Sequence, residues 1–383
     1  MKSKTKIIAM YLPQYHCIPE NDEFWGKGFT DWVTVKKAEP LFVGHDQPRV
    51  PLGNNYYDLS LKDNIVWQAK LAKQYGIDGF GIYHYWFNND KNILTKPAEI
   101  ILENKDINID FFFAWDNNNW KRSWSNVDGN SWAPIQENKD NKGPKILIPY
   151  ILGTEPDWKN HYKNLLPYFK DKRYIKKDGK PIFMVWGISD GIKRMAAYWD
   201  KLAKEDGFAG LCMIYKYDET GLVRRKSMIP DAELVFKYEP IFTAWNKLSI
   251  PERIVRKIRK VFNLKEGMKT YDYDIVWKEI IKDAKGRYSD KKIINGAFVS
   301  YDDTPRRGAE RGKILLGSTP EKFKRYFSEL LKITLQQGKP FIFITAWNEW
   351  GEGAYLEPDK TNEYGYLKAL DEAIKQTTNE YGK

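Results

Sequence analysis

Short apolar runs that end in polar or aromatic residues recur along the whole chain. There are eight of them, and each has the length and composition of a buried strand. They are Ile7–Leu12, Gly79–Tyr83, Asp110–Ala114, Pro181–Trp186, Gly210–Tyr215, Glu233–Glu239, Ile294–Ser300 and Phe341–Thr345.

Helical patterns lie between these runs. Asp63–Tyr75 keeps its apolar residues on one face, a second helix is expected from Thr319 to Gly338, and Leu367–Ile374 carries the last. Eight buried strands that alternate with helices predict a parallel sheet, and eight strands close a barrel. The predicted fold class is therefore α/β, with a single (β/α)8 TIM barrel and long βα-loop insertions.

A doubly wound open sheet is the structural alternative. The dinucleotide fingerprint that such sheets often carry is missing, because Gly26-Lys27-Gly28 lacks the third glycine and precedes no expected helix. No internal repeat or linker marks a second domain, so we expect one catalytic barrel over residues 1–383. Its loop insertions are expected at about 21–51, 116–160 and 240–290, and the extra apolar run Ile146–Tyr150 is assigned to the second.

The composition changes this picture in three ways. Aromatic residues make up 15% of the 383 residues, which favours a carbohydrate site. A net charge of +11 is compatible with an acidic partner, but no nucleic-acid module is found. The only cysteines are Cys17 and Cys212, and neither a signal-peptide core nor a membrane span is found, so we expect a cytoplasmic protein without disulfides.

The segment 250–267 has the pattern of a basic amphipathic helix. Apolar Ile254, Ile258 and Phe262 alternate with arginines and lysines. A surface helix docked on the barrel is the plain interpretation. The alternative is peripheral contact with an anionic membrane surface or a lipid-linked glycan.

Two carboxylates stand just past the last apolar run. Glu349 and Glu352 are three residues apart in Trp347-Asn348-Glu349-Trp350-Gly351-Glu352-Gly353. An unpaired carboxylate at the end of a buried strand is costly unless it faces a cavity. Enzymes usually break a glycosidic bond with two carboxylates in different environments. The alternative is a turn in which both glutamates are solvated and neither is catalytic.

Several motifs resemble those of the WbsX-like proteins of surface-polysaccharide (O-antigen and capsule) loci, which are relatives of glycoside hydrolase family 99. The motifs run in order through nearly the whole chain: Tyr11–Asp22, Trp25–Trp32, Gly76–Phe80, Tyr83–Phe87, Tyr174–Ile175, Asp178–Pro181, Asp302–Arg306 and Trp347–Pro358. The family-99 motif Asn-Glu-Trp-x-Glu-Gly falls on Asn348–Gly353.

The resemblance implies a (β/α)8 barrel that acts on α-mannosides in endo fashion, with retention of configuration through a 1,2-anhydro sugar. It assigns Glu349 as the base that takes the proton of the sugar 2-hydroxyl, and Glu352 as the acid that protonates the leaving oxygen. Because an acid must hold its proton, we expect the raised pKa on Glu352.

We expect the substrate-binding residues to follow the strand ends and the matched motifs. His84 has an equally simple interpretation as a structural histidine, and the tryptophans as packing. The set consists of Tyr11, Gln14, Tyr83, His84, Trp86, Trp115, Asn117, Trp120, Tyr238, Tyr301, Asp302, Asp303, Arg306, Trp347 and Asn348.

The chain departs from the family pattern at one place. WbsX-like proteins typically have Ala-Asn-Glu-Asn-Trp after strand three, where this chain has Asp116-Asn117-Asn118-Asn119-Trp120. A carboxylate is absent at Asn118, so the glycan preference of relatives does not carry over.

Two other functions compete with glycan hydrolysis. Asp272-Tyr273-Asp274 is the one Asp-x-Asp, which could hold a divalent ion in a nucleotide-sugar glycosyltransferase, although a solvated turn explains it as well. A non-catalytic glycan-binding barrel is the third hypothesis. We expect no cofactor and no metal, and a polysaccharide or oligosaccharide substrate; the sequence leaves the oligomeric state open.

Overall fold

The computed structural model describes residues 5–121, 146–217, 232–245 and 268–381. Its strands are β1 (Lys6–Tyr11), β2 (Gly79–Asn88), β3 (Lys91–Ile93), β4 (Asp110–Trp115), β5 (Trp120–Lys121), β6 (Ile146–Ile148), β7 (Lys176–Lys177), β8 (Lys180–Val185), β9 (Cys212–Lys216), β10 (Leu234–Phe236), β11 (Lys269–Asp272), β12 (Ile293–Phe298), β13 (Lys313–Leu316), β14 (Phe341–Thr345), β15 (Asn348–Glu349) and β16 (Ala354–Tyr355).

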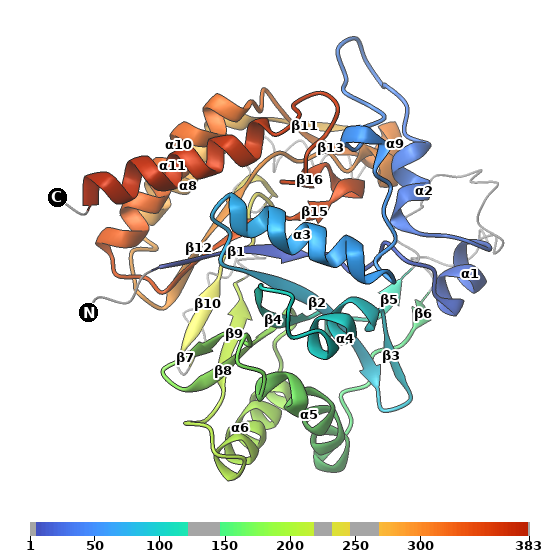
Figure 1. Cartoon of the computed structure of the whole chain (residues 1–383), viewed down its shortest axis with the longest axis vertical. Coiled ribbons are helices and arrows are strands. Elements are labelled where there is room, and N and C mark those ends of the chain that lie inside the picture. The colour runs from blue at the N-terminus through green and yellow to red at the C-terminus, as the bar shows by residue number, and fades with distance from the viewer. Residues whose placement is uncertain (1–4, 122–145, 218–231, 246–267, 382–383) are drawn as a thin grey trace, which may run out of the picture.

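The described helices surround the sheet (Figure 1). They are α1 (Pro19–Trp25), α2 (Asp31–Lys36), α3 (Lys62–Gln74), α4 (Lys96–Glu103), α5 (Glu155–Phe169), α6 (Asp190–Glu205), α8 (Tyr273–Lys285), α9 (Thr304–Arg311), α10 (Pro320–Gln336) and α11 (Gly365–Tyr381), with short turns at η1 (Leu52–Asn54), η2 (Ile241–Trp245) and η3 (Trp350–Glu352). Helices α3, α10 and α11 fall where the apolar spacing predicts them.

The eight predicted strands form a closed parallel barrel, which confirms the fold class. The ring runs β1, β2, β4, β8, β9, β10, β12 and β14, and β14 pairs with β1 to close it. The additional run at β6 pairs with β5 outside this ring, as expected for an insertion. Figure 1 shows α1, α2, α9, β15 and β16 gathered near the carboxyl end of β1, away from the amino terminus.

Contacts between strands that are not neighbours in the ring identify the side chains inside the barrel. Phe343 of β14 packs on Phe112 of β4 and on Phe236 of β10, with ring centroids 5.3 and 4.9 Å apart. Gly81 leaves the room that Phe112 needs, because a Cβ there would lie 2.9 Å from the Phe112 ring and 2.8 Å from the sulfur of Met10. Since side chains alternate along a strand, this layer fixes which residues of each strand face inward.

The insertion expected over residues 21–51 is partly helical. It contains α2 and the end of α1, and its later part is held by Asp302, whose carboxylate accepts hydrogen bonds from His45 and Gln47 at 2.8 and 2.7 Å. The insertion therefore lies against the segment that follows β12. The predicted basic helix over 250–267 lies outside the described residues, and its membrane contact stays a prediction.

No helix among the described residues is long and apolar enough to cross a membrane.

Candidate active site

Arg306 of α9 joins three carboxylates that come from distant parts of the chain. Its Nη1 lies 2.8 Å from Glu352 Oε1, and its Nη2 lies 2.9 Å from Asp31 Oδ2 and 3.5 Å from Glu349 Oε2. The motif after β14 supplies two of these carboxylates, and α2 supplies the third. A planar guanidinium can serve several oxygens at once, so Arg306 sets the geometry of the group.

Burial makes the environment of Glu349 unlike that of an ordinary glutamate. Only 4% of the residue is exposed, and its Oε2 accepts no hydrogen bond. Burial, with the neighbouring Glu352 charge, raises the pKa of Glu349 to about 8, although Arg306 opposes this. The raised pKa thus belongs to Glu349, the residue to which the resemblance assigns the base.

A wall of aromatic residues faces Glu349 across the barrel. The hydroxyls of Tyr83 on β2 and Tyr238 after β10 lie 2.9 Å apart, although these strands are not neighbours in the ring. The charges of Glu349 and Glu352 act on both tyrosines, so the two hydroxyls lie beside the carboxylate group. Trp186, which is only partly buried, packs edge-on against Tyr238 at 4.8 Å, and the Lys216 ammonium lies 4.8 Å from its ring. Aromatic faces beside polar groups suit the mixed faces of a sugar.

A buried network holds the loop with the carboxylates in place. Asn348 accepts a hydrogen bond from the Leu12 backbone N–H and donates one to the Leu12 carbonyl, which ties β15 to the end of β1. Tyr15 donates to the Asn348 carbonyl at 2.6 Å. Glu357 accepts hydrogen bonds from Trp350, Gln68 and Tyr57 at 2.7 to 2.8 Å. Asn348 is therefore placed as a support for the loop.

The residues that follow β12 have two roles: one holds the insertion, and others lie beside the carboxylate group. Asp302 holds the insertion, and although burial opposes it, Arg49 and hydrogen bonds keep the pKa of Asp302 below its usual range. Asp303 pairs with Arg307 at 2.8 Å, and burial raises its pKa to about 6. Tyr301 donates to Asp303. The charge of Glu352 acts on both Asp303 and Tyr301, so these two lie beside the carboxylate group.

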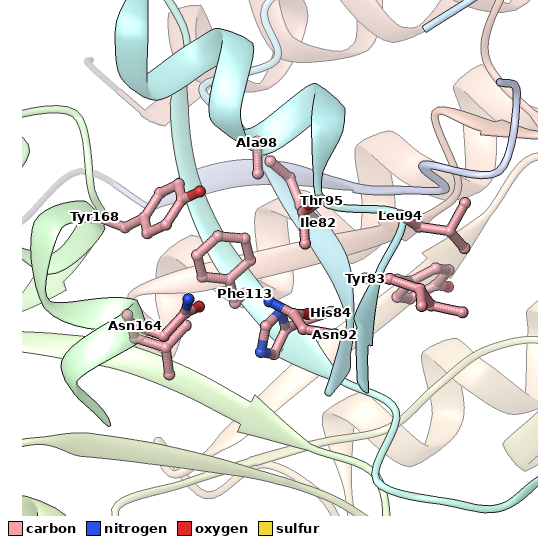
Figure 2. Close-up of a pocket in the computed structure, with 12 residues that line it drawn as sticks. Ile82, Tyr83, His84, Asn92, Leu94, Thr95, Ala98, Phe113, Asn164 and Tyr168 are labelled. Carbon is pink, nitrogen blue, oxygen red and sulfur yellow. The ribbon is translucent and has the colours of Figure 1, made fainter. Parts of the chain in front are cut away.

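Four predicted site residues face the helices and not the barrel interior. Tyr11 donates to Gln68 of α3 at 2.7 Å. His84 Nε2 lies 2.8 Å from His161 Nε2 on α5, and Trp86 and Trp115 pack on the same His161 ring. Figure 2 shows Tyr83 and His84 on opposite sides of β2. This corrects the prediction for Tyr11, His84, Trp86 and Trp115, because strand alternation sends their side chains outward.

A small cavity adjoins His84 on this outer layer (Figure 2). It holds about 20 Å³, enough for one water, and lies between β2, β3, α4 and α5. Burial lowers the pKa of His84 to about 3, so the imidazole stays neutral at ordinary pH. The structural interpretation of His84 therefore fits, since no sugar ring enters this space.

The remaining predicted residues connect loops. Asn117 bonds to the backbone of Trp186 and Gly187, and Trp120 stacks on Phe87 and Tyr85. Gln14 donates to Tyr85 at 2.9 Å. Trp347 is fully buried against Phe80, an outward residue of β2. Asn117 and Trp347 are thus placed as structural residues, whereas Gln14 and Trp120 support the inward Tyr85.

Sequence reasoning missed Asp31, Tyr85, Trp186 and Lys216 as members of this group. Asp31 stands inside the matched segment Trp25–Trp32, so the signal was present but was not interpreted as a carboxylate of the site. Tyr85 lies two residues after Tyr83, and period-two alternation alone would have selected it.

Among the described residues, no three side chains of His, Cys, Asp or Glu are grouped as metal ligands. Asp272 accepts a hydrogen bond from the Ile275 N–H and so caps α8. Asp274 pairs with Lys322 at 2.6 Å and with Arg325 at 3.1 Å. The first Asp-x-Asp carboxylate thus caps α8, and the second pairs with two cations of α10.

Comparison with known proteins gives three kinds of similarity. A family model described as "Glycosyltransferase WbsX" matches residues 7–370. The uncharacterized protein WxcX of Xanthomonas campestris pv. campestris (strain B100) is 29% identical over 374 residues, which are 96% of this chain and 49% of that protein. The chain therefore spans about half the length of the curated relatives it matches.

Solved structures share the fold. The GH99 endo-α-mannosidase from Bacteroides thetaiotaomicron superposes with a TM-score of 0.54 at 14% identity and covers 100% of both chains. A structure named "Glycoside hydrolase-like protein" gives a TM-score of 0.56 at 11% identity, covering 97% of this chain and 94% of its own.

Proposed function

Because the chain belongs to the WbsX glycosyltransferase family and has the fold of family-99 glycoside hydrolases, we propose that it cleaves an α-linked, mannoside-like glycan of a surface polysaccharide. The observation that carries this proposal is the carboxylate group at the end of β14. Glu349 and Glu352 share one buried arginine and face an aromatic wall. We propose endo cleavage with retention of configuration.

The proposed reaction has two steps. In the first, Glu349 takes the proton of the 2-hydroxyl, and O2 attacks C1 as the C1–O bond to the leaving group breaks. Glu352 gives its proton to the leaving oxygen. In the second, Glu352 takes a proton from water, which attacks C1 and opens the 1,2-anhydro ring, and Glu349 returns its proton to O2.

The electrostatics fit a base at Glu349. A sugar hydroxyl is a very weak acid, so a carboxylate with a raised pKa is the stronger acceptor for its proton. Burial raises the pKa of Glu349 to about 8, which places it near neutral pH. The hydrogen bond from Arg306 to Glu352 fixes the second carboxyl, and side-chain exposure of 20% leaves Glu352 open to a leaving group and to water.

The proposal is tested by glycan release. The protein is incubated with the polysaccharide of its own source and with α-mannan, and released oligosaccharides are measured by mass spectrometry. Release by the wild type that is lost in Glu349→Gln and Glu352→Gln supports the proposal. Absence of release, with consumption of a sugar nucleotide when an acceptor is supplied, would establish the transferase instead. Binding with neither reaction would establish a glycan-binding barrel.

The transferase is kept as the second candidate because the family description names that activity. The contacts of the one Asp-x-Asp disfavour a transferase that holds a metal there. Asp272 already accepts a hydrogen bond from the α8 backbone, and Asp274 already pairs with two cations of α10.

The pH dependence has a definite sign. Glu349 must be ionised to act as a base, and its pKa is raised to about 8, so kcat/KM should increase as the pH rises through that value. Initial rates of glycan release between pH 5 and pH 9.5 would measure this limb. A rate that falls through the same interval would assign the essential protonated group to Glu349 and reverse the two roles.

Replacement of Gly351 should disable the site without unfolding the barrel. A Cβ at this position would lie 2.5 Å from Arg306 Nε and 2.6 Å from Asp31 Oδ2, so Gly351→Ala must displace the arginine. We expect glycan release to fall about 10- to 100-fold. Gln74→Ala, an exposed change on α3, is the control and should match the wild type. Equal rates for wild type and Gly351→Ala would show that Arg306 is not needed in this position.

A further inference from the structure

Asp31 is a third carboxylate of the site. It lies at the first residue of α2, is 1% exposed, and is separated from Arg306 by 275 residues in the chain. Its Oδ2 accepts the hydrogen bond from Arg306 Nη2 at 2.9 Å, and its Oδ1 has no hydrogen-bond partner. An isolated buried carboxylate is costly, so the pairing with Arg306 is what this position requires.

Asp31 and Glu349 compete for one nitrogen atom. Arg306 Nη2 is at hydrogen-bond distance from Asp31 but 3.5 Å from Glu349, whose Oε2 accepts no hydrogen bond. The other terminal nitrogen, Nη1, is engaged by Glu352 at 2.8 Å. The guanidinium therefore supports Glu352 directly and leaves Glu349 with an ion pair at longer range.

We propose that Asp31 is a positioning residue, which draws Arg306 Nη2 away from Glu349 and so leaves the Glu349 carboxylate free to accept a proton from the substrate. The role in proton transfer rests on the proposed function; the competition for Arg306 does not. Gly351 is consistent with this arrangement, since only a residue without a Cβ lets the Asp31–Arg306 pair pass so close to η3.

Several groups besides Asp31 and Arg306 act on Glu349. The Tyr83 hydroxyl favours its charged form, and the charge of Glu352 disfavours it. Glu349 also interacts with the tyrosines Tyr15, Tyr85 and Tyr238, which come from the β1 loop, β2 and the end of β10. The charge of Asp31 itself raises the pKa of Glu349. A test must therefore separate the charge of Asp31 from its hold on Arg306.

The first experiment needs no glycan. The pKa of Glu349 is raised in the fold, so its ionisation lowers stability as the pH rises from about 4.5, its ordinary value, to about 8. Glu349→Gln should therefore raise the melting temperature by an increment that grows over this interval. In the Asp31→Asn variant, Arg306 Nη2 is free to turn to Glu349 and stabilise its charge. We therefore expect Glu349→Gln to raise the melting temperature less in the Asp31→Asn background than in the wild type. The midpoint of the pH dependence of this increment should fall by about one pH unit.

Two controls and a second variant make the result decisive. Glu39→Gln removes an exposed carboxylate from the same insertion and should leave the increment unchanged. In an Arg306→Met background, Asp31→Asn should no longer shift this midpoint, because no guanidinium is left for Asp31 and Glu349 to compete for. A shift that persists there would mean that Asp31 acts by charge alone and would overturn the proposal. Asp31→Ser is the second variant if Asp31→Asn does not fold.

The second experiment measures glycan release. Asp31→Asn should move the rising limb of kcat/KM to lower pH by about one unit and lower the rate above pH 8 roughly tenfold. An Asp31→Asn profile identical to that of the wild type would overturn the proposal while the proposed function stands. If the wild type releases no glycan, the proposed function fails, and the melting experiment still decides the competition for Arg306.

Discussion

Glu349→Gln and Glu352→Gln should each lose glycan release by about 10²- to 10⁴-fold, the range that a positioned acid or base contributes. The amide has the shape of the carboxyl group but neither accepts nor supplies the proton at the required point. Both residues lie on a loop that Asn348, Tyr15 and Glu357 hold in place, so we expect the variants to keep the barrel.

The leaving group separates the two roles. An aryl α-mannoside with an acidic phenol departs without a proton, so Glu352→Gln should recover much of its rate on this substrate, whereas Glu349→Gln should not. Rates on the aryl glycoside and on the native glycan are compared for each variant. Recovery by Glu349→Gln alone would exchange the assignments. Glu205→Gln, an exposed change on α6, is the control and should match the wild type.

The second large effect is on stability. Glu357 is 3% exposed and accepts hydrogen bonds from Trp350, Gln68 and Tyr57. Glu357→Ala leaves these three buried donors without their acceptor and opens a cavity, so we expect a loss on the order of 3–5 kcal/mol in the free energy of unfolding. Urea denaturation followed by tryptophan fluorescence measures it.

The loss should depend on pH in a known direction. Burial raises the pKa of Glu357 to about 7, so its contribution to wild-type stability is full below about 4.5 and declines as the pH rises through 7. The difference between wild type and Glu357→Ala should accordingly be larger at pH 5 than at pH 8. Glu357→Gln, which keeps one acceptor oxygen, should lose less than the alanine variant. A loss that grows with pH would contradict the raised pKa.

The barrel could be predicted from the chain because each strand signals itself locally. Runs such as Phe341–Ile344 are apolar throughout, as expected of a strand covered on both faces. Breaks near Gly76 and Gly338 mark the ends of the helices between the strands. Glu349 and Glu352 could be predicted for the same reason. They are close in the chain, at the end of a strand, where parallel barrels place their polar residues.

Asp31 lies in a matched motif, but its pairing with Arg306 could not be predicted from the chain. It meets Arg306 across 275 residues, and no local pattern records which loop of a barrel folds over which strand end. The raised pKa of Glu349 has the same origin, since it depends on burial and on the charges of Glu352 and Asp31 around one arginine. These are properties of the folded barrel and not of any local stretch of the chain.

The division between sequence and structure is clearest along β2. The chain by itself determined that Tyr83, His84 and Trp86 stand at a strand end, because the apolar run and its aromatic continuation are local. Only the tertiary structure decided that Tyr83 faces Glu349 while His84 and Trp86 pack on His161 of α5. Alternation makes neighbours face opposite ways, but a strand buried on both faces has no polar side to tell inside from outside, so closure of the barrel makes that choice.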